Sequence, residues 1–111
     1  QVGDDLVLVV RGPRIPCGTF RAAMGVRGWL KTFSGSALSG AYLSVAAPGR
    51  VRAGDQITVA SRPEHGIRVC DLYRAMTTEP QRWDGILAAA EADLGAEGRA
   101  MARAKETYSI G

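Results

Sequence analysis

The spacing of apolar residues changes at Cys70, and this change limits the folds open to the chain more than any other feature of the sequence. Upstream, apolar runs at residues 6–10 and 40–45 are typical of short strands, although runs of this length do not exclude a helix by periodicity alone. Downstream, apolar side chains recur every three or four residues, as they do on one face of a helix. The chain is therefore expected to be β-type up to residue 69 and helical over residues 70–111.

Two segments of the upstream part depart from the strand pattern. Residues 19–24 and 26–33 carry apolar side chains at helical spacing, and each is expected to form a short helix. Trp29, in the second segment, is expected to pack in the core. Two further short strands are predicted at residues 56–61 and 67–69, each of them after a turn.

The downstream part contains three predicted helices. The first covers residues 72–76, the second begins at Pro80 in the first turn, where proline is favoured, and the third covers residues 96–108. Three consecutive helices after the strands indicate a helical tail packed on the β unit. Cys70, which has apolar neighbours, is expected to be buried.

Length and charge narrow the functional classes. The chain has 111 residues, enough for one small domain with a modest core. Eight basic and three acidic residues precede Glu64, whereas six basic and eight acidic residues occur from Glu64 onward. The upstream part suits an anionic ligand, with an ordinary solvated basic surface as the alternative. With no signal peptide and no apolar run near the ~20 residues of a membrane span, a soluble cytoplasmic protein without membrane contact is expected.

The segment Arg11-Gly12-Pro13-Arg14-Ile15-Pro16-Cys17 is the strongest candidate for chemistry. Its two prolines stiffen the chain, and its two arginines bring permanent positive charge. If Pro16 or Cys17 opens the following helix, the thiol also lies among unpaired N–H groups at the positive end of the helix dipole. These features favour the thiolate, which is both a nucleophile and a soft-metal ligand. The alternative is a buried cysteine that acts as a small apolar residue.

Four segments together resemble the second half of a MOSC domain, the C-terminal domain of molybdenum cofactor sulfurases. They are Arg11-Gly-Pro-Arg-Ile-Pro-Cys17, Gly40-Ala-Tyr-Leu43, Val51-Arg-Ala-Gly-Asp55 and Arg62-Pro-Glu-His-Gly66. The resemblance is to stand-alone bacterial members, which include the hydroxylaminopurine resistance proteins. The second segment opens the strand predicted at residues 40–45, and the last two are turn-like. Asp55 and His65 are interpreted as turn residues, with no carboxylate partner apparent near His65.

The resemblance implies an α+β, mainly β fold. Residues 1–69 would be the C-terminal part of a MOSC-type β-barrel, and residues 70–111 a helical C-terminal extension. The chain begins at Gln1 rather than Met, and an upstream half of the barrel would be missing. Because strand edges would then be exposed, the segment in isolation is expected to be poorly soluble or unfolded.

The resemblance also implies a cofactor and the residues that hold it. Cys17 would be the protein ligand to molybdenum and the catalytic residue of the site. Arg14 and Arg11 would bind the pterin of the molybdenum cofactor (molybdopterin), whose phosphate an arginine grips well. Gly40 would let the backbone approach the cofactor closely, and Tyr42 would be a further contact, with core packing as its alternative. The family is also associated with pyridoxal phosphate binding.

Relatives often carry a basic residue at the positions of Ser44 and Thr19, so one or both of the usual positive contacts to the ligand would be absent here.

Two functions follow from the resemblance and remain open. One is the reduction of small N-hydroxylated substrates such as hydroxylaminopurine or amidoximes, with electrons from a redox protein. The other is a non-catalytic carrier of the molybdenum cofactor or its sulfur. Both functions are compatible with a homodimer. Nucleic acid is disfavoured as a partner, because the arginines are not interleaved with exposed aromatic residues as in single-strand binders.

Overall fold

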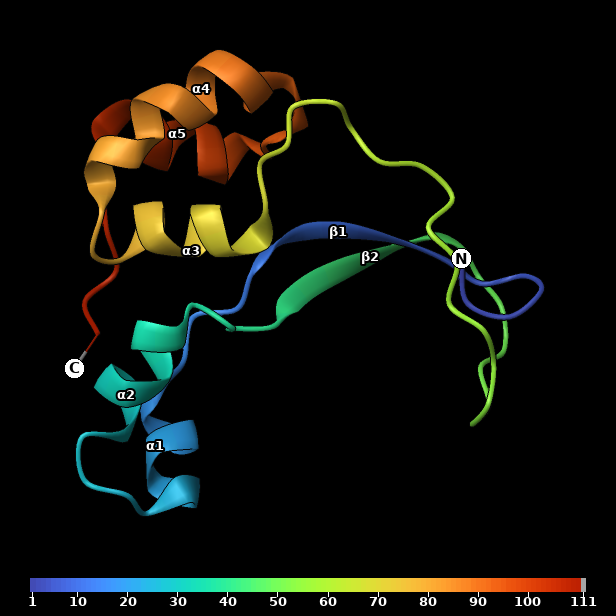
Figure 1. The fold of residues 1–111 in the computed structure, drawn as a ribbon, viewed down its shortest axis with the longest axis horizontal. Helices are drawn as coiled ribbons and strands as arrows, with labels where there is room; N and C mark the ends of the chain where they lie inside the picture. Colours follow the sequence, from blue (N-terminus) through green and yellow to red (C-terminus); the bar gives the residue numbers. More distant parts are fainter. Residues whose placement is uncertain (111) are drawn as a thin grey trace.

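The computed structural model describes residues 1–110, which form a two-stranded ribbon flanked by two groups of helices (Figure 1). Strands β1 (Val7–Pro13) and β2 (Ala41–Ala47) pair antiparallel. Helices α1 (Gly18–Met24) and α2 (Trp29–Ser36) lie in the connection between the strands. The C-terminal group comprises α3 (Val69–Met76), η1 (Pro80–Arg82), α4 (Trp83–Ala90), η2 (Glu91–Asp93) and α5 (Ala96–Ala104).

The ribbon begins as the sequence predicts, but β1 is longer than expected. β-Branched and other apolar residues favour the strand over its first half. Register irregularities between Val7 and Leu8 and between Val10 and Gly12 mark bulges, and the strand continues to Pro13, opposite Ala41. Proline is tolerated there because it ends the strand. The end of the ribbon that carries Pro13 lies between the two groups of helices (Figure 1).

Helices α1 and α2 are held together by three aromatic rings. The Phe20 ring lies edge-on to Trp29 and to Phe33, with centroid separations of 6.0 and 5.0 Å. This is the geometry that aromatic pairs prefer. Trp29 is half-buried, so the expected packing role is confirmed within this small cluster rather than within the main core.

The main hydrophobic core lies in the C-terminal helices. Trp83 is fully buried, and its Nε1–H donates to the carbonyl oxygen of Glu106 at 3.2 Å. Around it pack the buried residues of α3, α4, α5 and the turn before α5: Ala75, Ile86, Leu94, Met101 and Ala102. The three predicted helices are confirmed, with the third ending at Ala104.

The C-terminal helices contact the rest of the molecule mainly through α3. This helix packs against β1. The buried Tyr73 donates its hydroxyl hydrogen to Ser34 Oγ of α2 at 2.8 Å. α3 is thus the element that connects the ribbon, α2 and the main core.

Two features of the expected fold are wrong. The α+β class is confirmed, but residues 1–110 contain five α-helices against two strands and no barrel, so the fold is not mainly β. Residues 56–61 and 67–69 do not form strands: Ile57 makes one isolated bridge to Val2, and α3 already begins at Val69. A strand needs a continuous ladder, and beyond that bridge these residues have no neighbouring strand. Within residues 1–110 no helix has the length and apolarity needed to cross a membrane.

Candidate functional site

Cys17 occupies the junction between the proline-rich segment and α1. Its backbone is extended, with φ of −125° and ψ of 174°, and its carbonyl oxygen accepts the N–H of Arg21 at 3.1 Å. It is therefore the residue that begins the first helical hydrogen bond while its side chain remains outside the helix. The side chain is exposed, so the alternative of a buried apolar cysteine is wrong.

The local backbone lowers the pKa of the Cys17 thiol below its ordinary value of 9.0. The largest cause is the backbone N–H of Phe20, followed by that of Thr19; slight desolvation opposes them, and the Thr19 hydroxyl and the charge of Arg14 lower the pKa further. The direction of this shift is the one that the sequence leads us to expect. The charge of Arg14 makes the smallest contribution to the shift.

Arg11 is held on the ribbon by a residue that the sequence pattern did not single out for this role. Its Nε–H donates to Ser44 Oγ of β2 at 2.8 Å. Ser44 was expected only to mark a missing positive contact. Because one donor of the guanidinium is fixed by this hydroxyl, the terminal nitrogens keep a defined direction and remain able to bind an acceptor.

Gly40 and Tyr42 bring the start of β2 next to the proline-rich segment. Gly40 has φ of +78°, a conformation that favours glycine, and its carbonyl oxygen accepts the N–H of Arg14 at 3.2 Å. Tyr42 pairs with Gly12 across the ribbon, and 62% of it is exposed. Tyr42 is therefore not a core residue, and its ring is open to a ligand.

A cleft of about 390 Å³ opens where this end of the ribbon meets the C-terminal helices. The ribbon side includes Arg11, Pro13, Ile15 and Tyr42. Cys17 does not line the cleft, but it follows Ile15 by only two residues, so their Cα atoms are at most about 7 Å apart. Cys17 is thus close in the chain to the ribbon side of the cleft, although it is not part of the lining.

The opposite side of the cleft is helical. It is formed by Leu72 and Met76 of α3, by Leu94 before α5, by Glu97 and Met101 of α5, and by Tyr108. These residues come from a part of the sequence in which no site residue was predicted. They were missed because their apolar residues have the spacing of a helix that faces the core. This spacing does not show whether a side chain packs in the core or lines a cleft.

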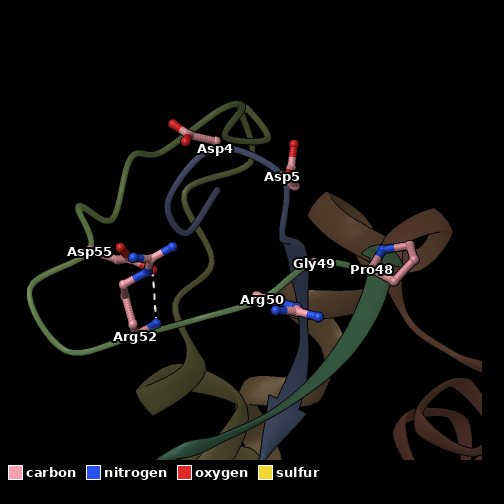
Figure 2. Close-up of a pocket in the computed structure, with 7 residues that line it drawn as sticks. All are labelled: Asp4, Asp5, Pro48, Gly49, Arg50, Arg52 and Asp55. Atoms are coloured by element: carbon pink, nitrogen blue, oxygen red, sulfur yellow. Dashed lines mark hydrogen bonds between the residues drawn. The ribbon is translucent and has the colours of Figure 1, made fainter.

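A larger hollow of about 700 Å³ lies at the other end of the ribbon, among the loops near the N-terminus (Figure 2). Charged side chains line it, including Asp4, Asp5, Arg50 and Arg52. Asp55 Oδ2 accepts the backbone N–H of Arg52 at 2.9 Å, which confirms Asp55 as a turn residue. None of the predicted site residues lines this hollow, and we place the candidate site at the smaller cleft.

His65 has a carboxylate partner that is distant in sequence. Its Nε2 lies 3.3 Å from Asp93 Oδ2, and its Nδ1 accepts the N–H of Ile67 at 2.9 Å. The imidazole thus fastens the loop before α3 to η2, consistent with a structural turn residue. Cys70 is half-buried rather than fully buried.

Cys17 is a single soft donor and not part of a metal site built by the protein alone. Within residues 1–110, no group of three or more His, Cys, Asp or Glu side chains could hold a metal ion. A thiolate suits a soft metal, and the nearby Arg11 and Arg14 suit an anionic group. The residues present fit a metal that arrives with sulfur ligands and an anionic group of its own.

Comparison with known proteins identifies one family. The family model described as MOSC domain matches residues 1–58, about half of the chain. No curated protein and no solved structure matches the chain. The match covers both strands, α1, α2 and the whole Arg11–Cys17 segment, and it ends before the C-terminal helices.

Proposed function

This chain belongs to the MOSC domain family, which implies a function connected with the molybdenum cofactor, and from that premise we propose that it binds the cofactor through Cys17 and reduces N-hydroxylated compounds. The observation that carries the proposal is the exposed thiol at the start of α1, with a pKa that the backbone N–H of Phe20 holds below the ordinary value. An ionised, accessible sulfur is what a metal ligand requires.

The neighbouring residues supply the rest of the binding surface in this proposal. Arg14 and Arg11 bind the anionic part of the cofactor, since guanidinium groups pair well with phosphate. Gly40 holds the backbone of the Arg14 segment in place through its carbonyl oxygen. Tyr42 offers an exposed ring beside them. When bound, the cofactor supplies two-electron redox chemistry, and the protein positions it.

The overall reaction breaks an N–O bond. The substrate N-hydroxyl group takes up two electrons and two protons, and the products are the corresponding amine or amidine and water. The electrons come from a redox protein that serves as the donor. Cys17 takes no part as a nucleophile; its sulfur anchors the metal beside the cleft.

A non-catalytic carrier of the cofactor or its sulfur is the second candidate. The observation that favours it is the position of Cys17, whose thiol is exposed outside the cleft. A sulfur presented at the surface suits transfer to another protein as well as it suits catalysis.

Metal analysis tests the ligand assignment. We expect the wild-type protein, produced in cells that make the cofactor, to carry molybdenum, and Cys17→Ala to lose most of it. Cys70→Ala is the matched control, because it removes the other cysteine and should leave the content unchanged. Equal molybdenum in the wild type and in Cys17→Ala would show that the assignment is wrong.

Turnover separates the two candidates. The loaded protein is supplied with a chemical reductant and hydroxylaminopurine, and product formation is followed. Conversion that depends on Cys17 supports the reductase. Retention of molybdenum without conversion, together with transfer of the metal to a cofactor-free molybdoenzyme, supports the carrier.

A further inference from the structure

The chain carries charge of one sign only between residues 6 and 54. This segment contains seven basic residues and no acidic one. Three of the basic residues, Arg21, Arg27 and Lys31, lie in α1, in the turn after it and in α2, and all three are exposed. Within residues 1–110, none of the three forms an ion pair. Their positive charge is therefore not compensated by this part of the protein.

α1 is poorly covered for so short a helix. Isolated helices below about 12–15 residues are marginal in water, and α1 has seven residues, none of them buried. Phe20, which packs on Trp29 and Phe33, is the only residue of α1 that is not exposed. Two larger apolar side chains, at the end of α1 and in the turn, are open to solvent: Met24 is 43% exposed and Val26 is 52% exposed. α1 and the turn thus present an apolar surface without a partner.

The exposed basic and apolar residues belong to one end of the molecule. Figure 1 shows α1 and the turn at the end opposite α4 and α5. Arg21 and Met24 are neighbours on α1, three residues apart. The turn is closed against the start of α2, because the carbonyl oxygen of Val26 accepts the N–H of Trp29 at 3.1 Å. We call the surface of this end the basic tip; it comprises Arg21, Met24, Val26, Arg27 and Lys31.

The composition of the basic tip favours a protein over a membrane or a nucleic acid as its occupant. Helices that lie in a membrane surface insert aromatic or leucine side chains, and single-stranded nucleic acids stack on exposed rings. The aromatic rings of α1 and α2 are instead packed on one another. A small apolar patch among cations is complementary to a protein surface that has apolar residues bordered by carboxylates.

We propose that the basic tip docks a partner protein that presents acidic side chains around a small apolar patch. The proposal rests on the proposed function, because both candidates need a second protein: the reductase needs an electron donor, and the carrier needs a recipient. α1 begins directly after Cys17, and its seven residues rise about 1.5 Å each, so it extends about 10 Å from Cys17. A protein docked on α1 therefore lies one short helix away from the cofactor that Cys17 holds in that function.

Two designed peptides test the charge and the apolar part of this surface. Both are amphipathic helices with the same stripe of leucines, flanked by glutamates in one and by lysines in the other. Binding to the full chain is measured by fluorescence anisotropy. We expect the glutamate peptide to bind at least about fivefold more tightly than the lysine peptide, and salt to weaken its binding. Equal affinity for the two peptides, or binding of neither, would overturn the proposal.

Matched variants locate the peptide on the basic tip. Arg27→Glu should weaken binding of the glutamate peptide about fivefold, whereas Arg27→Lys, which keeps the charge, should leave it within about twofold. Combining Arg27→Glu with Lys31→Glu should reverse the preference, so that the lysine peptide binds better. Arg50→Glu makes the same change of charge at an exposed position outside the basic tip and serves as the control. If Arg50→Glu weakens binding as much as Arg27→Glu does, the attraction is one of net charge and the docking surface is wrong.

Two further probes test the excluded occupants. Vesicles that contain phosphatidylglycerol and a single-stranded oligothymidine are titrated against the same protein. We expect both to bind more weakly than the glutamate peptide. Tighter binding of the vesicles or of the oligothymidine would overturn the proposal in favour of a membrane or a nucleic acid.

Molybdenum content distinguishes this proposal from the one on which it rests. Arg27→Glu should keep the metal content of the wild type while losing peptide binding. If Cys17→Ala keeps its metal but the peptide results hold, the cofactor assignment fails and the docking surface stands. If the metal behaves as expected and the peptides do not bind, the docking assignment fails alone.

Discussion

Backbone donors lower the pKa of the Cys17 thiol more than its charged neighbour Arg14 does. The N–H groups of Phe20 and Thr19 belong to the first turn of α1, and they are the two largest causes of the lowered pKa. Arg14 acts from a flexible side chain and contributes least. Its proposed role is therefore better assigned to the ligand than to the thiol.

Alkylation kinetics test the state of this thiol. In Cys70→Ala protein, the rate of reaction of Cys17 with iodoacetamide should rise with pH and reach half its maximum below pH 9.0, because the lowered pKa leaves more thiolate at any lower pH. Thr19→Val should move the midpoint upward by removing the hydroxyl, and Arg14→Gln should move it less. A midpoint at or above pH 9.0 would show that the pKa of Cys17 is not lowered.

At the scale of elements, one hydrogen bond joins the part of the chain that matches the family model to the C-terminal helices. Tyr73 of α3 is 1% exposed, and its hydroxyl donates to Ser34 Oγ of α2. Because the Tyr73 hydroxyl is buried, water cannot take the place of Ser34 as its hydrogen-bond partner. The contact couples α2 to the main core.

A double-mutant cycle measures this coupling. Tyr73→Phe should lower the free energy of unfolding in urea by about 1 kcal/mol, and Ser34→Ala should cost about 1–3 kcal/mol because it leaves the buried Tyr73 hydroxyl without a partner. The double variant should cost less than the sum of the two. Tyr42→Phe, at an exposed ring, is the control and should change stability little. Additive effects of Tyr73→Phe and Ser34→Ala would show that the bond is not formed in solution.

Elements whose signal is local could be predicted from the sequence. The apolar run before Arg11 gives β1, and Pro80 and the helical spacing after Cys70 give the C-terminal helices. The start of α1 close to Cys17 was likewise predictable, because it depends on residues within one turn. The strand predicted at residues 56–61 failed because strand formation depends on a partner elsewhere in the chain.

The candidate site likewise has one part that could be predicted from the sequence and one part that could not. The Arg11–Cys17 segment carries its own signal in its prolines and arginines. The helical wall of the cleft does not, because Met76 and Tyr108 meet only through tertiary packing. The Asp93 partner of His65 was missed for the same reason.

For the whole molecule, the most consequential surface is one face of the ribbon. Val10 pairs with Leu43, and Leu8 pairs with Val45, so the four side chains share a face. Val10, Leu43 and Val45 are at least half exposed. Contiguous apolar surface of this kind in a folded protein marks a contact site or promotes association.

Association should therefore depend on this face. We expect the protein to self-associate with increasing concentration in sedimentation velocity, and Leu43→Lys to shift it toward the monomer. Val59→Lys adds the same charge at another exposed apolar position and should leave association unchanged. A wild-type protein that stays monomeric at every concentration would rule out this role for the face.

The main core lies entirely in the C-terminal helices, whereas the thiol lies in the part that matches the family model. The C-terminal helices therefore contain the main core, and they also form one side of the cleft. The helical part can therefore be exchanged or reshaped while the Arg11–Cys17 segment stays as it is.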